Sequence, residues 1–318
     1  MVKKTEKKKL NSDVKVKSKT VKKTDVKKNT SKEDISSKTI TSKKGRNKFL
    51  FIVPIIIVIC IIGFVWFFVL SPSVVEAQLI IESGDVQVKH EGGSWSSAEN
   101  GMLLYQSDIV KTGDNTSSSI ILFESSIIRL DSNTEVMLKE IIQEAGKTSV
   151  TIQQDAGRTW NTVLKVSGID DYEVQTPTTV ASVRGTSFDV YIQLDNITVG
   201  VGRGVVVISK IISGNVLDTI ELKMNEAVSI YGDIDQILKT KAFLKDGWVL
   251  KNQEEDEGFK SDVKTELYKR IDPYIDDIKE RWDVTDEEFD VLVTGYVNGN
   301  FDLPPDTPEW IKDLMELS

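Results

Sequence analysis

The residue types that most often carry out catalysis or bind metals are scarce in this chain. His90 and Cys60 are the only histidine and the only cysteine among 318 residues. A Ser-His-Asp or Cys-His set would have to use His90, which lies in a Gly-rich turn beside Glu91. A zinc site built on histidine needs more than one of them. We therefore expect no enzyme, no cofactor and no metal centre.

Glycine-rich and acidic stretches do not change this expectation. Gly200, Gly202 and Gly204 join two strand-like runs and open no helix, so they do not predict a phosphate-binding loop. Carboxylate pairs are frequent, but a chain with 49 acidic residues contains such pairs without catalytic meaning. The sequons at Asn115 and Asn196 are candidate glycosylation sites on outward-facing loops.

A 22-residue run without charge, Phe49 to Leu70, divides the chain. Residues 1–48 hold 18 Lys and Arg against 5 Asp and Glu, whereas residues 71–318 hold 22 against 44. The run is long enough to cross a bilayer as a helix of roughly 33 Å. The basic residues Lys43, Lys44, Arg46 and Lys48 precede it, so the positive-inside rule places the N-terminus in the cytoplasm.

Two other interpretations of the run compete with a membrane helix. A buried core helix is rarely apolar on every face over this length. A cleaved signal peptide has support from the small residues around Val75 and Ala77, but its apolar region is usually shorter and starts nearer the N-terminus. We expect a single-pass cell-membrane protein whose C-terminal bulk is extracellular or periplasmic. Cys60 then lies inside the membrane, and the outer part has no disulfide.

The Lys-rich segment 1–48 is expected to be a disordered cytoplasmic tail, because its first aromatic neighbour is Phe49 and it has little apolar surface to bury. Its basic residues nearest the membrane suit anionic lipid headgroups. Binding of nucleic acid is not expected, since no aromatic residue interleaves the lysines. A simple role in setting the topology is the alternative.

Residues 74–253 are predicted to form a mainly β domain. Short runs with alternating apolar residues recur there and are separated by Gly, Asn, Asp and Ser, which is typical of strands and turns. We expect an antiparallel sandwich or jelly roll, or a short β-solenoid. The expected inward-facing residues include Val86 and Val88, Val136 and Leu138, Val150 and Ile152, Tyr172 and Val174, Phe188 and Val190, Ile197 to Val201, and Ile220 to Met224.

These runs carry an ordered set of motifs. They include Trp95-x-x-Ala98-x-x-Gly101, Asp108-Ile109 followed by Thr112-Gly113, Thr176-Pro177, and Val183-Arg184-Gly185-Thr186-x-Phe188. The set closely resembles the FecR domain over about residues 84–210. The resemblance implies an envelope-exposed module, and its best-known members are transmembrane regulators with a folded cytoplasmic domain that binds a sigma factor. The 48-residue tail lacks the helix pattern of such a domain, and Glu124-Ser125-Ser126 replaces the family's Asp-Gly-Ser turn.

The motif residues suggest structural roles. Trp95 and Trp160 are large enough to anchor a core. Gly113 and Asn115 suit a tight turn, and Gly185 suits a bulge or a close backbone approach. Arg184 has five donors and, if buried, should meet carbonyls or an acid such as Asp108 or Asp189. We expect a structural brace, with a surface that binds an anionic ligand as the alternative.

Residues 254–318 are expected to form an acidic helical domain after a charged linker at 254–258. Apolar residues from Val263 to Trp282 recur every three or four positions. Asp272-Pro273 should split this helix with Asp272 as a cap, and Thr285-x-x-Glu288 should open the next as a capping box. A last short helix should start near Pro308. The segment is either a cap packed on the β domain or itself, or a partner-binding module.

These observations favour a non-enzymatic, membrane-anchored cell-surface protein whose FecR-like ectodomain recognises a protein or glycan ligand. One alternative is a transmembrane signal regulator of the FecR type that passes ectodomain occupancy to a cytoplasmic partner. Another is a structural protein of the cell envelope.

Overall fold

The structure is a computed structural model, and it describes residues 77–144, 147–194, 196–231, 237–240, 245–300 and 302–317. All of these residues belong to one compact unit, Ser71–Ser318. The predicted tail at 1–48, its basic residues 43–48 and the predicted membrane helix at 49–70 lie outside the described residues. None of the described helices is long and apolar enough to cross a membrane.

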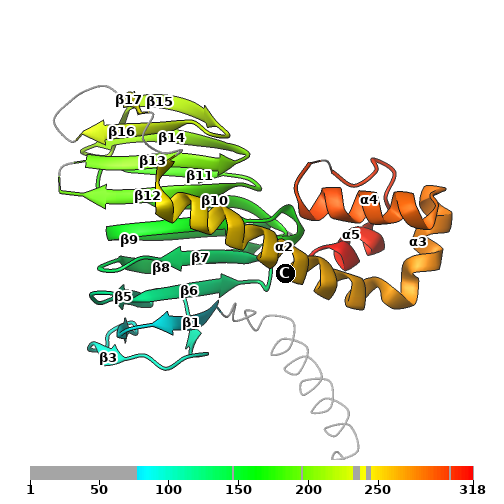
Figure 1. The fold of residues 1–318 in the computed structure, drawn as a ribbon, viewed down its shortest axis with the longest axis horizontal. Helices are drawn as coiled ribbons and strands as arrows, with labels where there is room; N and C mark the ends of the chain where they lie inside the picture. Colours follow the sequence, from blue (N-terminus) through cyan, green and yellow to red (C-terminus); the bar gives the residue numbers. More distant parts are fainter. Residues whose placement is uncertain are drawn as a thin grey trace, which may run out of the picture. The chain divides into compact units, whose positions relative to one another are not determined.

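Two β-sheets enclose the main core, so the prediction of a mainly β domain with C-terminal helices is confirmed (Figure 1). Sheet A contains β1 (Ala77–Ser83), β4 (Leu103–Leu104), β6 (Ser117–Leu122), β7 (Ser126–Leu130), the second half of β9 (Lys147–Val163), β12 (Ser187–Gln193), β13 (Asn196–Arg203), β16 (Ala227–Tyr231) and β17 (Ile237–Thr240). Sheet B contains β2 (Val86–Lys89), β3 (Ser96–Ser97), β5 (Ile109–Thr112), β8 (Glu135–Glu144), the first half of β9, β10 (Ile169–Gln175), β11 (Thr179–Val183), β14 (Val205–Ile212) and β15 (Asn215–Lys223).

The 17-residue strand β9 belongs to both sheets. Its first half pairs with β8 and β10 in sheet B, and its second half pairs with β7 and β12 in sheet A. Gly157 lies at the crossing with φ +78°. The β9–β10 pair is parallel, unlike the pairs of the predicted antiparallel sandwich, because the chain passes through the short helix η2 (Lys165–Ser167) before it returns to sheet B.

Period-two alternation identified most of the core correctly. Val86, Val88, Val150, Ile152 and Phe188 are all buried between the two sheets. Burial of one side chain of this size stabilises the fold by about 1.5–3 kcal/mol relative to leaving it exposed to water. Met224 is an exception, since it follows the end of β15 and is 57 % exposed.

The turns show which residues must adopt a left-handed backbone. Asn115 has φ +52°, as the predicted tight turn requires. The turn between β6 and β7 is the one in which Glu124-Ser125-Ser126 replaces the Asp-Gly-Ser sequence of the FecR pattern. Phe123 and Glu124 both have positive φ there, where glycine would be favoured, and Ser125 donates its amide to the Leu122 carbonyl at 3.3 Å.

The C-terminal segment is helical from an earlier point than the sequence suggested. Helix α2 runs over Gly247–Ile271, so the predicted charged linker at 254–258 is wrong: those residues lie inside a helix. The helix is followed by η4 (Asp272–Tyr274), α3 (Ile275–Trp282), α4 (Asp286–Val297) and α5 (Glu309–Met315). The break at Asp272-Pro273 is confirmed, but the predicted cap is wrong: Ile271 is the N-cap of η4, and Asp272 lies in its first turn.

The helices form a second apolar core. The predicted stripe is confirmed, with Val263, Leu267, Ile271 and Ile278 buried. The capping box is also confirmed, because Thr285 accepts the Glu288 amide and Glu288 accepts the Thr285 amide. Leu164, the N-cap of η2, and Val166 within η2 join this core and attach the helices to the β domain.

We predict that Gly157→Ala destabilises the protein by about 2 kcal/mol or more, because a Cβ there would lie 2.4 Å from the Thr134 Cα in addition to the cost of positive φ. Gly214 has φ +79° and open space around it, so Gly214→Ala should cost only about 1 kcal/mol. Urea unfolding of both variants checks this. Equal losses of stability in the two variants would show that β9 tolerates a side chain at the point where it crosses between the sheets.

Candidate functional site

Helix α2 covers the outward face of sheet A, the face opposite the main core. Along the second half of β9 the side chains alternate: Asn161 and Val163 point to the core, whereas Arg158, Trp160 and Thr162 meet α2 or its N-cap. The strands beside this contact carry small residues at Gly200, Gly202 and Ala227. A Cβ on Gly202 would lie 2.5 Å from the Trp160 ring.

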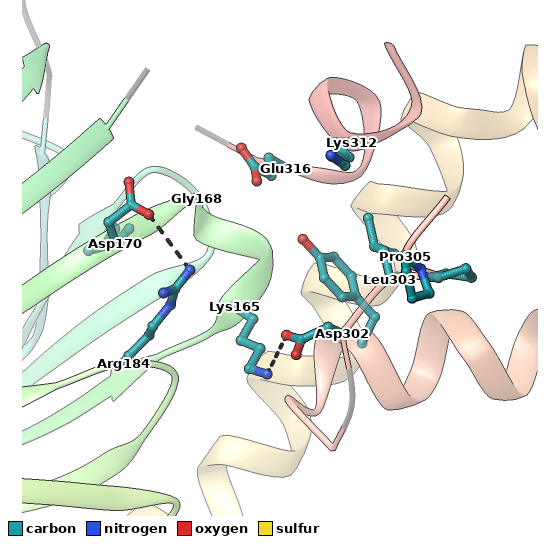
Figure 2. A pocket seen from close by; sticks show the side chains of 12 residues that line it. Lys165, Gly168, Asp170, Arg184, Asp302, Leu303, Pro305, Lys312 and Glu316 are labelled. Atoms are coloured by element: carbon teal, nitrogen blue, oxygen red, sulfur yellow. Dashed lines mark hydrogen bonds and ion pairs between the residues drawn. The ribbon is translucent and has the colours of Figure 1, made fainter. Parts of the chain in front are cut away.

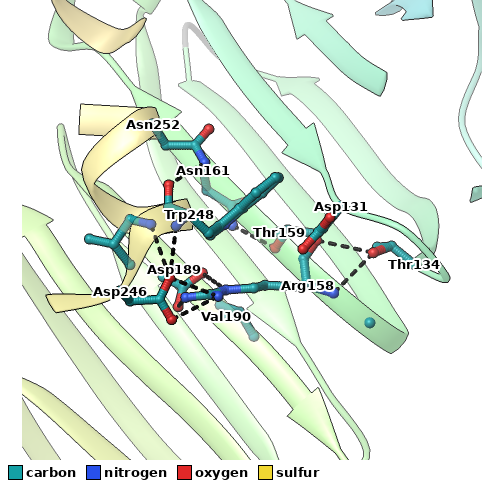
Figure 3. A network of polar contacts seen from close by, with 12 residues as sticks. Asp131, Thr134, Arg158, Thr159, Asn161, Asp189, Val190, Asp246, Trp248 and Asn252 are labelled. Carbon is teal, nitrogen blue, oxygen red and sulfur yellow. Dashed lines mark hydrogen bonds and ion pairs between the residues drawn. The ribbon is translucent and has the colours of Figure 1, made fainter. Parts of the chain in front are cut away.

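Arg158 is the first of two arginines buried under α2 (Figure 3). Its Nε and Nη2 donate to the two carboxylate oxygens of Asp189 on β12, both at 2.8 Å. Its Nη1 donates to Asp246 at 3.0 and 3.2 Å. The guanidinium also lies 4.9 Å from the Tyr191 ring centroid. Such a bidentate pair combines strong hydrogen bonds with a fixed geometry.

Asp246 links this pair to the start of α2. The same carboxylate that meets Arg158 also caps the helix by accepting the amides of Trp248 at 2.9 Å and Val249 at 3.3 Å. Placement of the first turn of α2 is therefore coupled to the buried arginine of sheet A.

Asp256 forms the second attachment, ten residues further along α2. Its buried carboxylate accepts hydrogen bonds from Arg129 Nη1 and Thr162 Oγ1 at 2.7 Å and from Trp160 Nε1 at 3.1 Å. Arg129 also lies 3.4 Å from Glu255. Breaking a buried pair by removing one partner typically costs about 3–5 kcal/mol. We call the contacts of Arg158 and Asp256 with their partners the α2 clamp.

Burial changes the acidity of one member of the clamp. Desolvation raises the pKa of Asp189 to about 6, and the hydrogen bonds and positive charge of Arg158 only partly oppose this shift. For Arg158, burial lowers the pKa, but Asp189 and Asp246 together outweigh it, so the guanidinium stays charged.

A cleft of about 360 Å³ lies between η2 and the C-terminal helices (Figure 2). Lys165 on its wall pairs with Asp302 at 2.7 Å. Arg184 lies on the β-domain side, and its nearest acid is Asp170 at 3.7 Å. The Arg184 side chain is 73 % exposed, so it is not the buried group that was expected to meet Asp108 or Asp189. Asp189 is held by Arg158 instead, and Asp108 lies 2.9 Å from His90.

The charge of this cleft is mixed. Glu316 is half-buried, and its pKa is raised by desolvation and by the nearby carboxylates of Asp170, Asp313 and Glu309. The pKa of Asp302 is lowered by Lys165. Cations and acids thus both line the opening, and Arg184 is exposed there.

The other motif residues are spread over the β domain rather than gathered at one site. Val183, Thr186 and Phe188 are buried. Trp95 is 38 % exposed beneath Lys111, so its predicted role as a core anchor is wrong, whereas Trp160 is fully buried as predicted. The remaining positions are turn glycines with positive φ at Gly101 and Gly185, the turn Thr176-Pro177 between β10 and β11, and Gly113, whose amide donates to the Asp85 carbonyl.

Local residue patterns did not identify the α2 clamp. Arg129, Arg158 and Asp189 are charged residues at outward positions of three neighbouring strands, which is the one signal that could have revealed them. Their partners on α2 lie about a hundred residues away in the sequence, for example 127 between Arg129 and Asp256.

Comparison with known protein families agrees with the motifs. Residues 108–207, from the turn before β5 into β14, match the family model described as FecR protein. Over these residues the chain is similar to FecR proteins. The match includes Thr112, Arg158, Arg184 and Phe188, so one side of the α2 clamp lies within the matched residues.

Among solved structures, two crystal structures of a putative anti-sigma factor from Parabacteroides distasonis ATCC 8503, at 2.50 and 1.65 Å resolution, are similar to this chain. Each shares 18 % identity over 43 % of this chain, with a TM-score of 0.35. The similarity spans 62 % of the anti-sigma factor, and we draw no functional conclusion from it. No curated protein matches the chain.

We predict that Arg158→Ala destabilises the protein by about 3–5 kcal/mol, because Asp189 would remain buried without its partner. Arg184→Ala should change stability by less than about 0.5 kcal/mol, since this arginine is exposed. Urea unfolding of the two variants checks the contrast. A large loss of stability in Arg184→Ala would show that Arg184 has a structural role despite its exposure.

The raised pKa of Asp189 predicts a pH effect. The folded state holds this proton more tightly than the unfolded chain, so the stability contributed by Asp189 is full below about pH 4 and declines as the pH rises through about 6. Between pH 4.5 and 7.5 the stability of the native chain should fall by about 2 kcal/mol relative to Asp189→Asn. A difference that stays constant over this range would contradict the shift.

Proposed function

We propose that the chain is a signal regulator of the FecR type, in which a sensing domain outside the membrane acts through a single helix on the cytoplasmic tail. The FecR match over residues 108–207 carries this proposal. The apolar run at 49–70 and the change of charge across it support the placement in the membrane.

The α2 clamp supplies a device suited to such a role. Helix α2 is held on the FecR domain by buried ion pairs and hydrogen bonds at two points, Arg158 to Asp246 and Arg129 to Asp256. Interactions of this kind depend on exact partners, so a ligand or a second protein that displaces one carboxylate would loosen α2 on the sheet, while the apolar contacts of Leu164 and Val166 keep the helical segment attached. An entirely apolar contact would discriminate less between the molecules that could displace the helix.

The hypothesis of a cell-surface binding protein becomes part of this proposal, because a sensor must recognise a ligand. The tail differs from the folded sigma-factor-binding domain of the best-known family members. We therefore propose that its 18 basic residues act on an acidic cytoplasmic partner or on anionic lipid.

The experiment compares transcript profiles of host cells that produce the full chain or its variants at equal membrane levels. Asp256→Asn weakens the clamp and should change a defined set of transcripts. Glu255→Gln is the matched control: it alters the neighbouring carboxylate, which is exposed and 3.4 Å from Arg129, and should change none. Removal of residues 3–42 from the Asp256→Asn chain should abolish the response.

Two outcomes would refute the proposal. In the first, Asp256→Asn leaves transcription unchanged, although proteolysis shows that α2 is loosened on sheet A. Alternatively, the response could persist after removal of the tail. Either result would favour the simpler role of an anchored binding protein.

A further inference from the structure

A second pocket lies directly under α2, beside the clamp. Its volume is about 250 Å³, and its lining includes Trp160, Ser187, Arg203 and Gln253. This pocket is separate from the cleft that contains Arg184, since the two share no lining residue.

Arg203 is the unusual residue of this pocket. It stands at the end of β13, opposite Ser187 of β12, and its guanidinium lies near Gly299, whose added Cβ would be 3.0 Å from Nη2. Within the described part of the chain, the side chain of Arg203 has no hydrogen-bond or ion-pair partner. By contrast, Arg129 and Arg158 on the same face are fully engaged with carboxylates. Burial lowers the pKa of Arg203, and the charges of Asp256 and Glu257 only partly oppose this.

Two further donors in the pocket lack a partner among the described residues. Ser187 is 2 % exposed, and its buried hydroxyl makes no hydrogen bond. The Gln253 side-chain amide, which approaches Gly202 from α2, likewise makes none. An unpaired buried hydroxyl such as that of Ser187 costs free energy, whereas Arg203 and Gln253 are only partly buried. A single acceptor in this small cavity would serve all three donors.

The two acids that line the pocket, Asp256 and Glu257, are already engaged with other donors. Asp256 already accepts three hydrogen bonds, from Arg129, Trp160 and Thr162. Glu257 is paired with Lys260 at 2.6 Å. Among the described residues, Arg203 is therefore the one cation of the pocket lining that makes no direct ion pair, although the charges of Asp256 and Glu257 act on it from a distance.

We propose that this pocket binds a small molecule with a carboxylate group and a short apolar body. The fork of Arg203 matches the two oxygens of a carboxylate, and Ser187 and Gln253 supply further donors. Trp160 and Met224 supply the apolar wall. Gly202 keeps the wall open, because any side chain there would meet the Trp160 ring. The cavity is too small for a folded partner.

The test is calorimetric titration of the purified full-length chain in detergent with butyrate, succinate and benzoate. Butyramide serves as the uncharged counterpart of butyrate, and sulfate represents other oxyanions. At least one carboxylate should bind saturably and more tightly than butyramide and sulfate. Arg203→Met should weaken its binding about tenfold or more, the effect expected for the loss of a charge-assisted hydrogen bond. Arg184→Met, which removes an exposed arginine of the other cleft, should not.

Ser187→Ala separates binding from folding. Because the Ser187 hydroxyl is unpaired in the free protein, its removal should leave the melting temperature unchanged or higher, and yet weaken carboxylate binding severalfold. Absence of saturable binding by every carboxylate would overturn the proposal. So would equal binding of butyramide or sulfate, or equal losses in Arg203→Met and Arg184→Met. Binding is measured without any signalling readout, so this result and that of the transcript experiment can differ.

Discussion

The outward face of sheet A carries charged side chains that can be buried only because α2 brings carboxylates to them. Arg129 and Arg158 would be solvated surface residues if the helix were absent. With the helix in place, both arginines are desolvated. The free-energy cost of this desolvation is offset by Asp246 and Asp256 from α2 and by Asp189 from the sheet itself. The position of α2 follows from this pairing, and the pocket at Arg203 exists because the helix bridges the sheet there.

The attachment combines two kinds of contact with different properties. Near η2, Leu164 and Val166 join the apolar core of the helices, which is tolerant of small shifts. Under α2, direction-dependent hydrogen bonds hold the helix at Asp246 and Asp256. The first kind keeps the helical segment associated, and the second specifies its register on the sheet. A change confined to the polar contacts could therefore alter the register without detaching the segment.

Much of the fold could be predicted from local patterns. The alternation around Val150 and Ile152, the break at Asp272-Pro273 and the capping box at Thr285 are all short-range signals, and each was correct. The start of α2 was missed because Gly258 and the surrounding acids resemble a linker, whereas tertiary contacts of Asp256 hold them in a helix. Trp95 was wrongly predicted to anchor the core, and the exposure of Arg184 could not be predicted, for a related reason. Whether an arginine or tryptophan is buried depends on which distant element packs against it, and the partners of Arg158 lie 31 and 88 residues away.

The course of β9 through both sheets has a mechanical consequence. In a sandwich of independent sheets, one layer can shear across the other. Here a single covalent strand crosses between them at Gly157, and Gln154 just before the crossing donates to the carbonyls of Gly157 and Val190. A load applied at Arg158 is therefore shared by sheet B through the backbone of β9. The β domain should move as one rigid body, which leaves the contact with α2, rather than sliding between the sheets, as the part able to yield.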